Sequence, residues 1–297
     1  MINHSTVTPH SPADEARFDL PTRVDRSDLQ QLLAAHPGNS TFEQALGSIQ
    51  NGRDLLRMLS CYIYFNSIFG SGVANLAGEI GAQQSLFRDP GEPMAITADR
   101  SVEVAARIFF AAVDEFGVGG GTATGRSTHR TLAQATLKAI GSFFDYDLAT
   151  MNQIAEPNAR TLTAIDQVRD GYAISQAVDE QKIFRSIGFH MGSEVLADEE
   201  FNLLDSFLRT KHPDLVNHLK KTKVTINEVQ VSAYHWIQIH TTVEADHFDA
   251  AMLGANLALR YYHQRPQAQL EAKAWILQGF KEFAVTQADF MDGLMKS

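Results

Sequence analysis

The stretch IHTTVEADHFDAAM, residues 239–252, sets two histidines and two acids within eight positions of an otherwise apolar and small-residue segment. A helix turns by about 100° per residue, so Glu244 would lie about 40° and His247 about 20° from the direction of His240. Asp246 would point about 120° away, towards another face. The spacing therefore predicts a helix that carries three potential metal ligands along one narrow stripe.

Helical patterns also dominate the rest of the chain. We expect helices over 27–36, 40–50, 52–85, 99–116, 128–141, 158–178, 179–209, 212–221, 225–264 and 266–295. A break in 52–85 is expected near Gly70 or Gly72. These patterns predict an all-α fold, with 26–297 as a single domain and 1–25 as a flexible lead-in rich in Pro, Ser, Thr and His.

The segment closest to a β-strand pattern is KVTINEVQVSAY, residues 223–234. Thr225 is followed three residues later by Glu228, which is the spacing of a helix capping box. We therefore interpret this segment as leading into the helix over 225–264.

The composition excludes several classes of function. A chain of 297 residues that is 44% hydrophobic can bury a sizeable core. Its net charge of -10 argues against nucleic acid or an anionic membrane as partner. The single cysteine, Cys61, excludes an internal disulfide framework and fits a reducing cytoplasm. The start has no apolar segment typical of a secretory signal, and the uncharged stretch 58–78 contains enough Asn, Ser and Gly to predict a buried helix rather than a membrane span.

Two further regions carry candidate ligands. Glu115 ends an apolar helical pattern and His129 opens the next, with a glycine-rich turn between them. Within that turn GGTATGRS, residues 120–127, approximates a phosphate-binding loop, but an arginine replaces its lysine and no strand precedes it. Glu194 lies among apolar and small residues, four positions after His190 on the same helical face. Each of these residues alone is more typical of an exposed side chain than of a site.

Known helical metal motifs fit only in part. Glu244 and His247 form an E-x-x-H, the spacing used by di-iron carboxylate bundles, but such bundles use two copies and this chain has one. The chain has no H-E-x-x-H, so a zinc protease is unsupported. What remains is H-x-x-x-E-x-x-H, with three ligands on one helix.

Taken in order, these residues resemble the heme-oxygenase-like di-iron oxidases, also called CADD-like or iron-containing redox enzymes, which are structural relatives of the TenA and PqqC proteins. The family pattern is a glutamate that ends one core helix, a histidine that opens the next, a second glutamate on a later helix, and a final H-x-x-x-[DE]-x-x-H. The matching positions in this sequence are Glu115, His129, Glu194, His240, Glu244 and His247. Glu180 is the alternative to Glu194. The resemblance covers roughly residues 50–260 and implies a heme-oxygenase-like helical bundle.

The resemblance also implies a chemistry. Three carboxylates and three imidazoles suit two Fe ions, cycling between Fe²⁺ and Fe³⁺, with Mn as the other candidate metal. O₂ would be the co-substrate, and a small organic molecule, an amino acid or an amino-acid-derived intermediate of a natural-product pathway, would be oxidised. N-oxygenation, desaturation and oxidative C–C cleavage are the outcomes known in the family. An external electron donor and a homodimer are further expectations at the family level.

Residues for substrate binding are less defined. A carboxylate substrate would need an arginine, and the candidates are Arg126, Arg130 and Arg185. Tyr234 and His190 are candidates either for the pocket lining or for hydrogen-bonded core positions.

Two other classes of protein remain open at this point. A metal-free TenA-like or PqqC-like enzyme would not bring the six side chains together, and TenA-like hydrolysis would need Cys61 as its nucleophile. A non-catalytic helical binding protein would expose the stripe on 239–252. The apolar residues Trp236 and Phe248 beside that stripe disfavour full exposure.

Overall fold

The computed structural model describes residues 22–117, 127–265 and 267–295. Most of these residues are helical, and the described part contains one two-stranded sheet, so the predicted all-α class is confirmed. The lead-in before residue 22 and the segment 118–126, which includes Arg126 and nearly all of the phosphate-loop-like sequence, lie outside the described residues. None of the described helices has the length and apolar character needed to cross a membrane.

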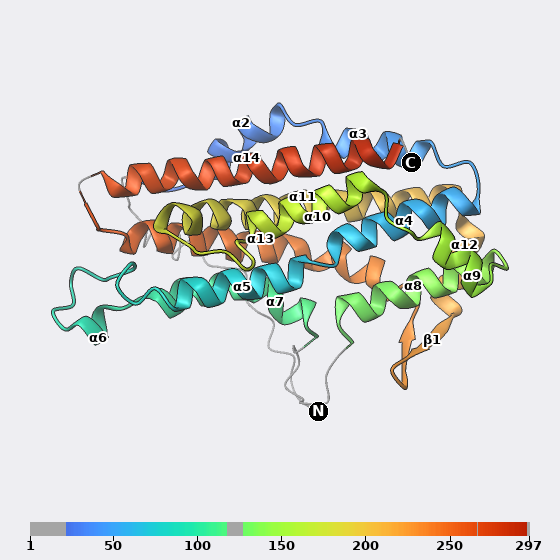
Figure 1. The fold of residues 1–297 in the computed structure, drawn as a ribbon, viewed down its shortest axis with the longest axis horizontal. Helices are drawn as coiled ribbons and strands as arrows, with labels where there is room; N and C mark the ends of the chain where they lie inside the picture. Colours follow the sequence, from blue (N-terminus) through green and yellow to red (C-terminus); the bar gives the residue numbers. More distant parts are fainter. Residues whose placement is uncertain (1–21, 118–126, 266, 296–297) are drawn as a thin grey trace.

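The longer helices run along the long axis of the molecule (Figure 1). They are α4 (Gly52–Asn66), α5 (Phe69–Gly81), α7 (Ser101–Glu115), α8 (His129–Phe143), α10 (Ala159–Gly171), α11 (Glu180–Lys211), α13 (His235–Tyr261) and α14 (Ala268–Met295). The shorter helices are α2 (Arg26–Ala34), α3 (Gly38–Gly47), α6 (Ala95–Ala98), α9 (Leu148–Ile154) and α12 (Pro213–Lys221). Helix α11 packs most extensively against α14 and α13, and α13 also packs against α7. This arrangement brings the middle of α11, the first half of α13 and the end of α7 together.

Most predicted helices are present, with differences at their ends. The expected helix 52–85 is divided at Ser67 and Ile68, slightly before the two glycines that were expected to break it. The helix expected over 158–178 ends at Gly171, and the short helices α6 and α9 were not predicted.

The predicted helical start at 225 is wrong, because residues 223–232 form a β-hairpin. Strands β1 (Lys223–Ile226) and β2 (Val229–Ser232) pair antiparallel, with Val224 opposite Val231. The connecting residues Asn227 and Glu228 have φ angles of 48° and 66°, as a two-residue hairpin turn with both central residues in the left-handed region requires. Alternating β-branched residues on both sides of an Asn-containing turn outweigh the capping-box spacing.

Two glycines allow α11 and α14 to approach closely. A Cβ atom on Gly188 would lie 1.8 Å from the carbonyl oxygen of Ile276, and one on Gly279 would lie 1.8 Å from the carbonyl oxygen of Arg185. These neighbours are backbone atoms, so they cannot rotate away as a side chain could. The contact therefore fixes the distance of α11 from α14.

We expect Gly188→Ala to lower the free energy of unfolding by about 3 kcal/mol or more, because overpacking against atoms that can relax already costs about 1–3 kcal/mol. Urea denaturation would measure the change. Gly78→Ala is the matched control, since a Cβ there meets nothing within 4 Å and Gly78 lies inside α5. That control should be neutral or stabilising by up to about 1 kcal/mol. Equal effects of the two substitutions would contradict the close-packing argument.

Candidate metal centre

All six predicted ligands lie at the centre of the bundle, and they form two groups. The first group is Glu115, His129 and His240; the second group is Glu194, Glu244 and His247. In each group, one potential ligand atom from every residue lies within 4.8 Å of the others. Five of the six side chains are buried, and Glu115 is partly buried. Each group could therefore hold a metal ion.

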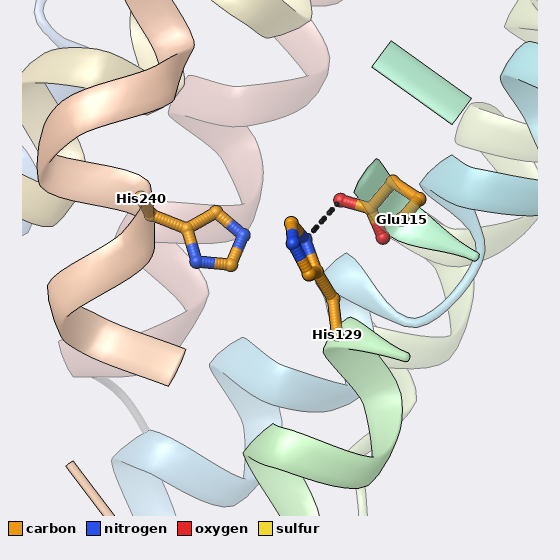
Figure 2. A group of neighbouring side chains, drawn as sticks. All are labelled: Glu115, His129 and His240. Carbon is orange, nitrogen blue, oxygen red and sulfur yellow. Dashed lines mark hydrogen bonds and ion pairs between the residues drawn. The ribbon is translucent and has the colours of Figure 1, made fainter. Parts of the chain in front are cut away.

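The first group joins three helices (Figure 2). Glu115 is the last residue of α7, and His129 is the first residue of α8, directly after the N-cap Thr128. His129 Nδ1 lies 2.9 Å from Glu115 Oε1, and the rings of His129 and His240 have centroids 4.4 Å apart. The helix ends thus place a carboxylate and an imidazole opposite His240 on α13.

Each of the two histidines in the first group has one ring nitrogen that is available to bind a metal ion. His240 Nδ1 lies 2.6 Å from the Trp236 carbonyl oxygen, so this nitrogen carries the proton and Nε2 keeps its lone pair. Burial, together with the neighbouring His129, holds the pKa of His240 well below its usual range, so the ring is neutral at pH 7. His129 Nε2 is buried without a hydrogen-bond partner among the described residues. A buried nitrogen of this kind is costly unless something binds it.

Glu244 lies between the two groups. Its Oε1 is 3.8 Å from His240 Nε2, and its Oε2 is 3.5 Å from His247 Nδ1. The predicted stripe on 239–252 is therefore present, with the carboxylate between two imidazoles on the same helix face. A carboxylate that faces both groups with different oxygens has the arrangement needed to bridge two cations.

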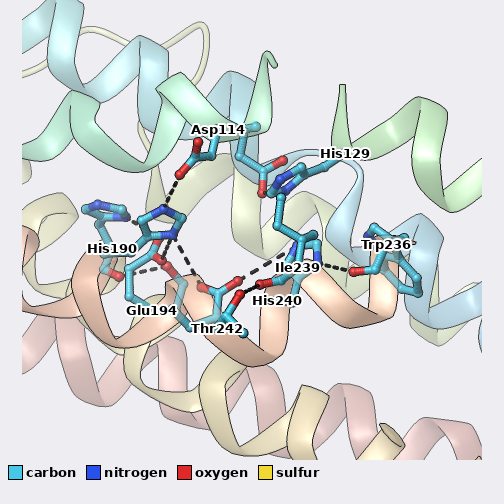
Figure 3. Close-up of polar contacts among 12 residues, drawn as sticks. Asp114, His129, His190, Glu194, Trp236, Ile239, His240 and Thr242 are labelled. Atoms are coloured by element: carbon cyan, nitrogen blue, oxygen red, sulfur yellow. Dashed lines mark hydrogen bonds and ion pairs between the residues drawn. The ribbon is translucent and has the colours of Figure 1, made fainter. Parts of the chain in front are cut away.

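The second group is held by contacts on both sides of His247. Figure 3 shows the polar network that includes Asp114, His190 and Glu194. His247 Nδ1 lies 3.4 Å from Glu194 Oε2, in addition to its contact with Glu244. On the opposite edge of the ring, His247 Nε2 lies 3.1 Å from Asp114 Oδ2. An Asp that accepts a hydrogen bond from one imidazole nitrogen leaves the other nitrogen directed at the site, as in carboxylate–histidine–metal arrangements.

The ionisation of the second group reflects its burial and its excess of carboxylates. Burial opposes a charge on His247, but hydrogen bonds with Asp114, Glu194 and Glu244 outweigh it and raise the pKa of His247 to about 12. Burial raises the pKa of Glu244 to about 8. Although burial acts in the opposite direction, the neighbouring imidazoles of His190 and His247 lower the pKa of Glu194. The His247 imidazolium thus supplies positive charge that a bound cation would otherwise supply.

Several supporting residues were not identified as such from the sequence. His190 was predicted as a pocket or core residue; its Nδ1 lies 3.2 Å from Glu194 Oε1, and it therefore positions that carboxylate. The buried Tyr172 hydroxyl lies 3.2 Å from the same nitrogen and 2.8 Å from Ser193 Oγ. Asp114 was missed: it precedes Glu115 directly, but a helix points the two side chains about 100° apart, so adjacency to a candidate ligand did not indicate its role.

Other candidates lie away from the two groups. Glu180 pairs with Arg265 at 2.6 Å near the start of α11, so it is not part of either group. Arg185 pairs with Glu282, and Arg130 is exposed. The Tyr234 hydroxyl donates a hydrogen bond to Asp205. Cys61 is buried in the apolar core.

A cavity adjoins the groups. The volume that the centre of a water-sized molecule can occupy in this cavity is about 30 Å³. Its lining consists of Phe65, Asn66, Phe69, Glu115, Ser193, Glu194, Ala197, Glu200, Phe201, His240, Glu244 and Phe283. Four phenylalanines and four glutamates thus line the same small space.

No protein-family model and no curated protein sequence matches this chain. The geometry of the two groups and their surroundings therefore carries the functional argument.

Proposed function

We propose that this chain is a non-heme di-iron oxidase or oxygenase with a heme-oxygenase-like helical bundle, which uses O₂ to oxidise a small organic molecule. The observation that carries the proposal is the convergence of the six ligand residues, from four helices, into two adjacent buried groups. A chance combination of short motifs would not be expected to converge in this way.

The donor set favours two iron ions. Each group offers imidazole and carboxylate donors, which suit Fe and Mn better than soft-metal chemistry does. Two divalent cations bring four positive charges into the bundle, and the three carboxylates offset most of that charge. Glu244, between the groups, would be shared by both ions. Mn is the alternative metal for the same donors.

The bound metals would supply the redox chemistry with O₂, and the chain supplies position and environment. Glu115 and His129 hold one side of the site from the ends of α7 and α8. Asp114 orients His247 through Nε2, and His190 orients Glu194 through Oε1. The phenylalanines that line the cavity give the site an apolar border beside the ligand carboxylates.

The two alternative classes explain less of the structure. A non-catalytic helical protein was expected to expose the ligand stripe, but His240, Glu244 and His247 are all at most 5% exposed. A metal-free enzyme would bury three carboxylates and three imidazoles together without a metal to bind them, although His129 Nε2 has no hydrogen-bond partner among the residues that the structure describes. The small substrate, the external electron donor and the homodimer stay predictions from the resemblance.

The test is an anaerobic titration of the metal-free protein with Fe²⁺, followed by exposure to O₂ while the visible spectrum is recorded. We expect two Fe²⁺ bound per chain and a transient long-wavelength absorption band after O₂ is added. His263→Ala should behave like the wild type, because His263 is exposed and lies outside both groups. Failure to bind iron specifically, with the wild type indistinguishable from His247→Ala, would overturn the proposal.

A further inference from the structure

The cavity beside the two groups contains one carboxylate that the metals would not use. Of the four glutamates that line it, Glu115, Glu194 and Glu244 belong to the groups, and Glu200 does not. Glu200 is only 3% exposed and lies on α11, past Glu194. Its role is therefore not explained by metal binding.

Glu200 accepts hydrogen bonds from two neutral side chains, but no cationic side chain of the described residues pairs with it. The Tyr62 hydroxyl donates a hydrogen bond to Glu200 Oε2 at 2.6 Å, and Gln287 Nε2 donates one to Oε1. No Lys or Arg lines the cavity, and Glu200 forms no ion pair with any residue that the structure describes. Burial without a cation raises the pKa of Glu200 to about 7. Buried carboxylates are normally paired with a cation. Glu200 has two neutral hydrogen-bond donors but no cationic partner among the described residues.

A ligand in the cavity can supply that partner. A carboxylate with two accepted hydrogen bonds still has about two acceptor positions left. The lining also includes Phe65, Phe201 and Phe283, and aromatic rings suit an apolar body and can also attract a cation. The room in the cavity, about 30 Å³, equals that of about two water molecules, so the ligand has few heavy atoms unless side chains move.

We propose that Glu200 binds the ammonium group of a small organic amine in this cavity, with its carbon end towards the metal groups. This inference rests on the proposed function in one respect, namely that the amine is the molecule to be oxidised. Recognition of the amine by Glu200 does not itself need metal. Arg130 and Arg185 do not line the cavity, so among the residues that the structure describes a substrate carboxylate would have no arginine partner there.

The test measures binding without turnover. Full-length protein is prepared both metal-free and loaded anaerobically with Mn²⁺, and dissociation constants are measured by NMR for ethylammonium, ethanol and acetate. We expect ethylammonium to bind at least about tenfold more tightly than ethanol, as one charge-assisted hydrogen bond allows. Glu200→Gln keeps the size of the side chain and should weaken ethylammonium binding by about tenfold or more. Glu103→Gln, which changes an exposed carboxylate on α7 that does not line the cavity, should leave it unchanged.

Two results would overturn the inference: ethanol binding as tightly as ethylammonium to the wild type, or Glu200→Gln binding ethylammonium like the wild type. If Glu200→Gln does not fold, the wild-type series alone decides. Metal content measured on the same samples separates the two proposals. Two bound ions with no preference for the amine would remove this inference and keep the proposed function. If the protein takes up no metal but binds the amine in a way that depends on Glu200, the proposed function is removed and this inference is kept.

Discussion

Replacing His129 or His247 by alanine is expected to reduce bound Fe²⁺ from two ions per chain to one, while replacing Glu244 by alanine weakens both ions. His129 contributes only to the first group and His247 only to the second, whereas Glu244 directs one oxygen at a histidine of each. Mutation of a residue that only orients a metal ligand typically lowers metal affinity by about 10- to 100-fold. Removal of a ligand itself should therefore lower the affinity by more than this. One titration therefore separates the two histidine substitutions, which should each leave one tightly bound ion per chain, from Glu244→Ala, which should weaken the binding of both ions.

Anaerobic equilibrium dialysis followed by metal analysis would measure these stoichiometries. His263→Ala is the matched control, with two ions expected. Thermal unfolding with and without metal gives a second readout, because an ion at about 100 times its dissociation constant stabilises the native state by about 2.7 kcal/mol. Retention of two tightly bound ions in Glu244→Ala would show that this carboxylate is not shared between the groups.

The part of the centre that is local in sequence could be predicted from the sequence. Helical spacing alone places His240, Glu244 and His247 on one face, because three and four residues correspond to about one turn. Glu115, His129 and Glu194 could be joined to that stripe only through the order of motifs in a known family. The observed convergence depends on how α7, α8 and α11 pack around α13, which no spacing in the sequence states.

Asp114 illustrates what the sequence could not show. It points about 100° away from Glu115 around α7, so a single helix cannot present both side chains to one ligand position. Only the packing of α13 against α7 brings Asp114 to His247, on the side of the ring away from Glu194 and Glu244. The order of the two adjacent acids therefore could not reveal that one belongs to the first group and the other supports the second.

Gly70 and Gly72 illustrate a different difficulty. They were interpreted as helix breakers, but both lie inside α5, and their missing side chains make room for neighbours. A Cβ on Gly72 would lie 2.6 Å from the ring of Tyr172, and one on Gly70 would lie 3.0 Å from Glu115 Cβ. A glycine that breaks a helix and a glycine that admits a distant residue look the same in the sequence.

Metal binding is expected to release protons, and this makes affinity strongly dependent on pH. With a pKa of about 12, His247 is protonated at neutral pH, and an ion at Nδ1 must displace that proton. Glu244, with a pKa of about 8, is also largely protonated below pH 8 and must lose its proton to bind a cation. His240 is already neutral, because its pKa is well below the usual range, and it releases none. Protons leave when the metal binds, so the affinity must rise with pH.

The expected size follows from the number of protons. Two protons released near pH 6.5 correspond to about a hundredfold gain in the overall binding constant per pH unit, and one proton near pH 9 corresponds to about tenfold. Calorimetric titration with Mn²⁺ under anaerobic conditions, in buffers of different ionisation enthalpy, counts the protons directly. Glu244→Gln cannot ionise at this position, so it should release about one proton fewer at pH 6.5 and the same number as the wild type at pH 9. An overall binding constant that does not change with pH would mean that the ions bind away from His247 and Glu244, since neither group can accept a cation there while it keeps its proton.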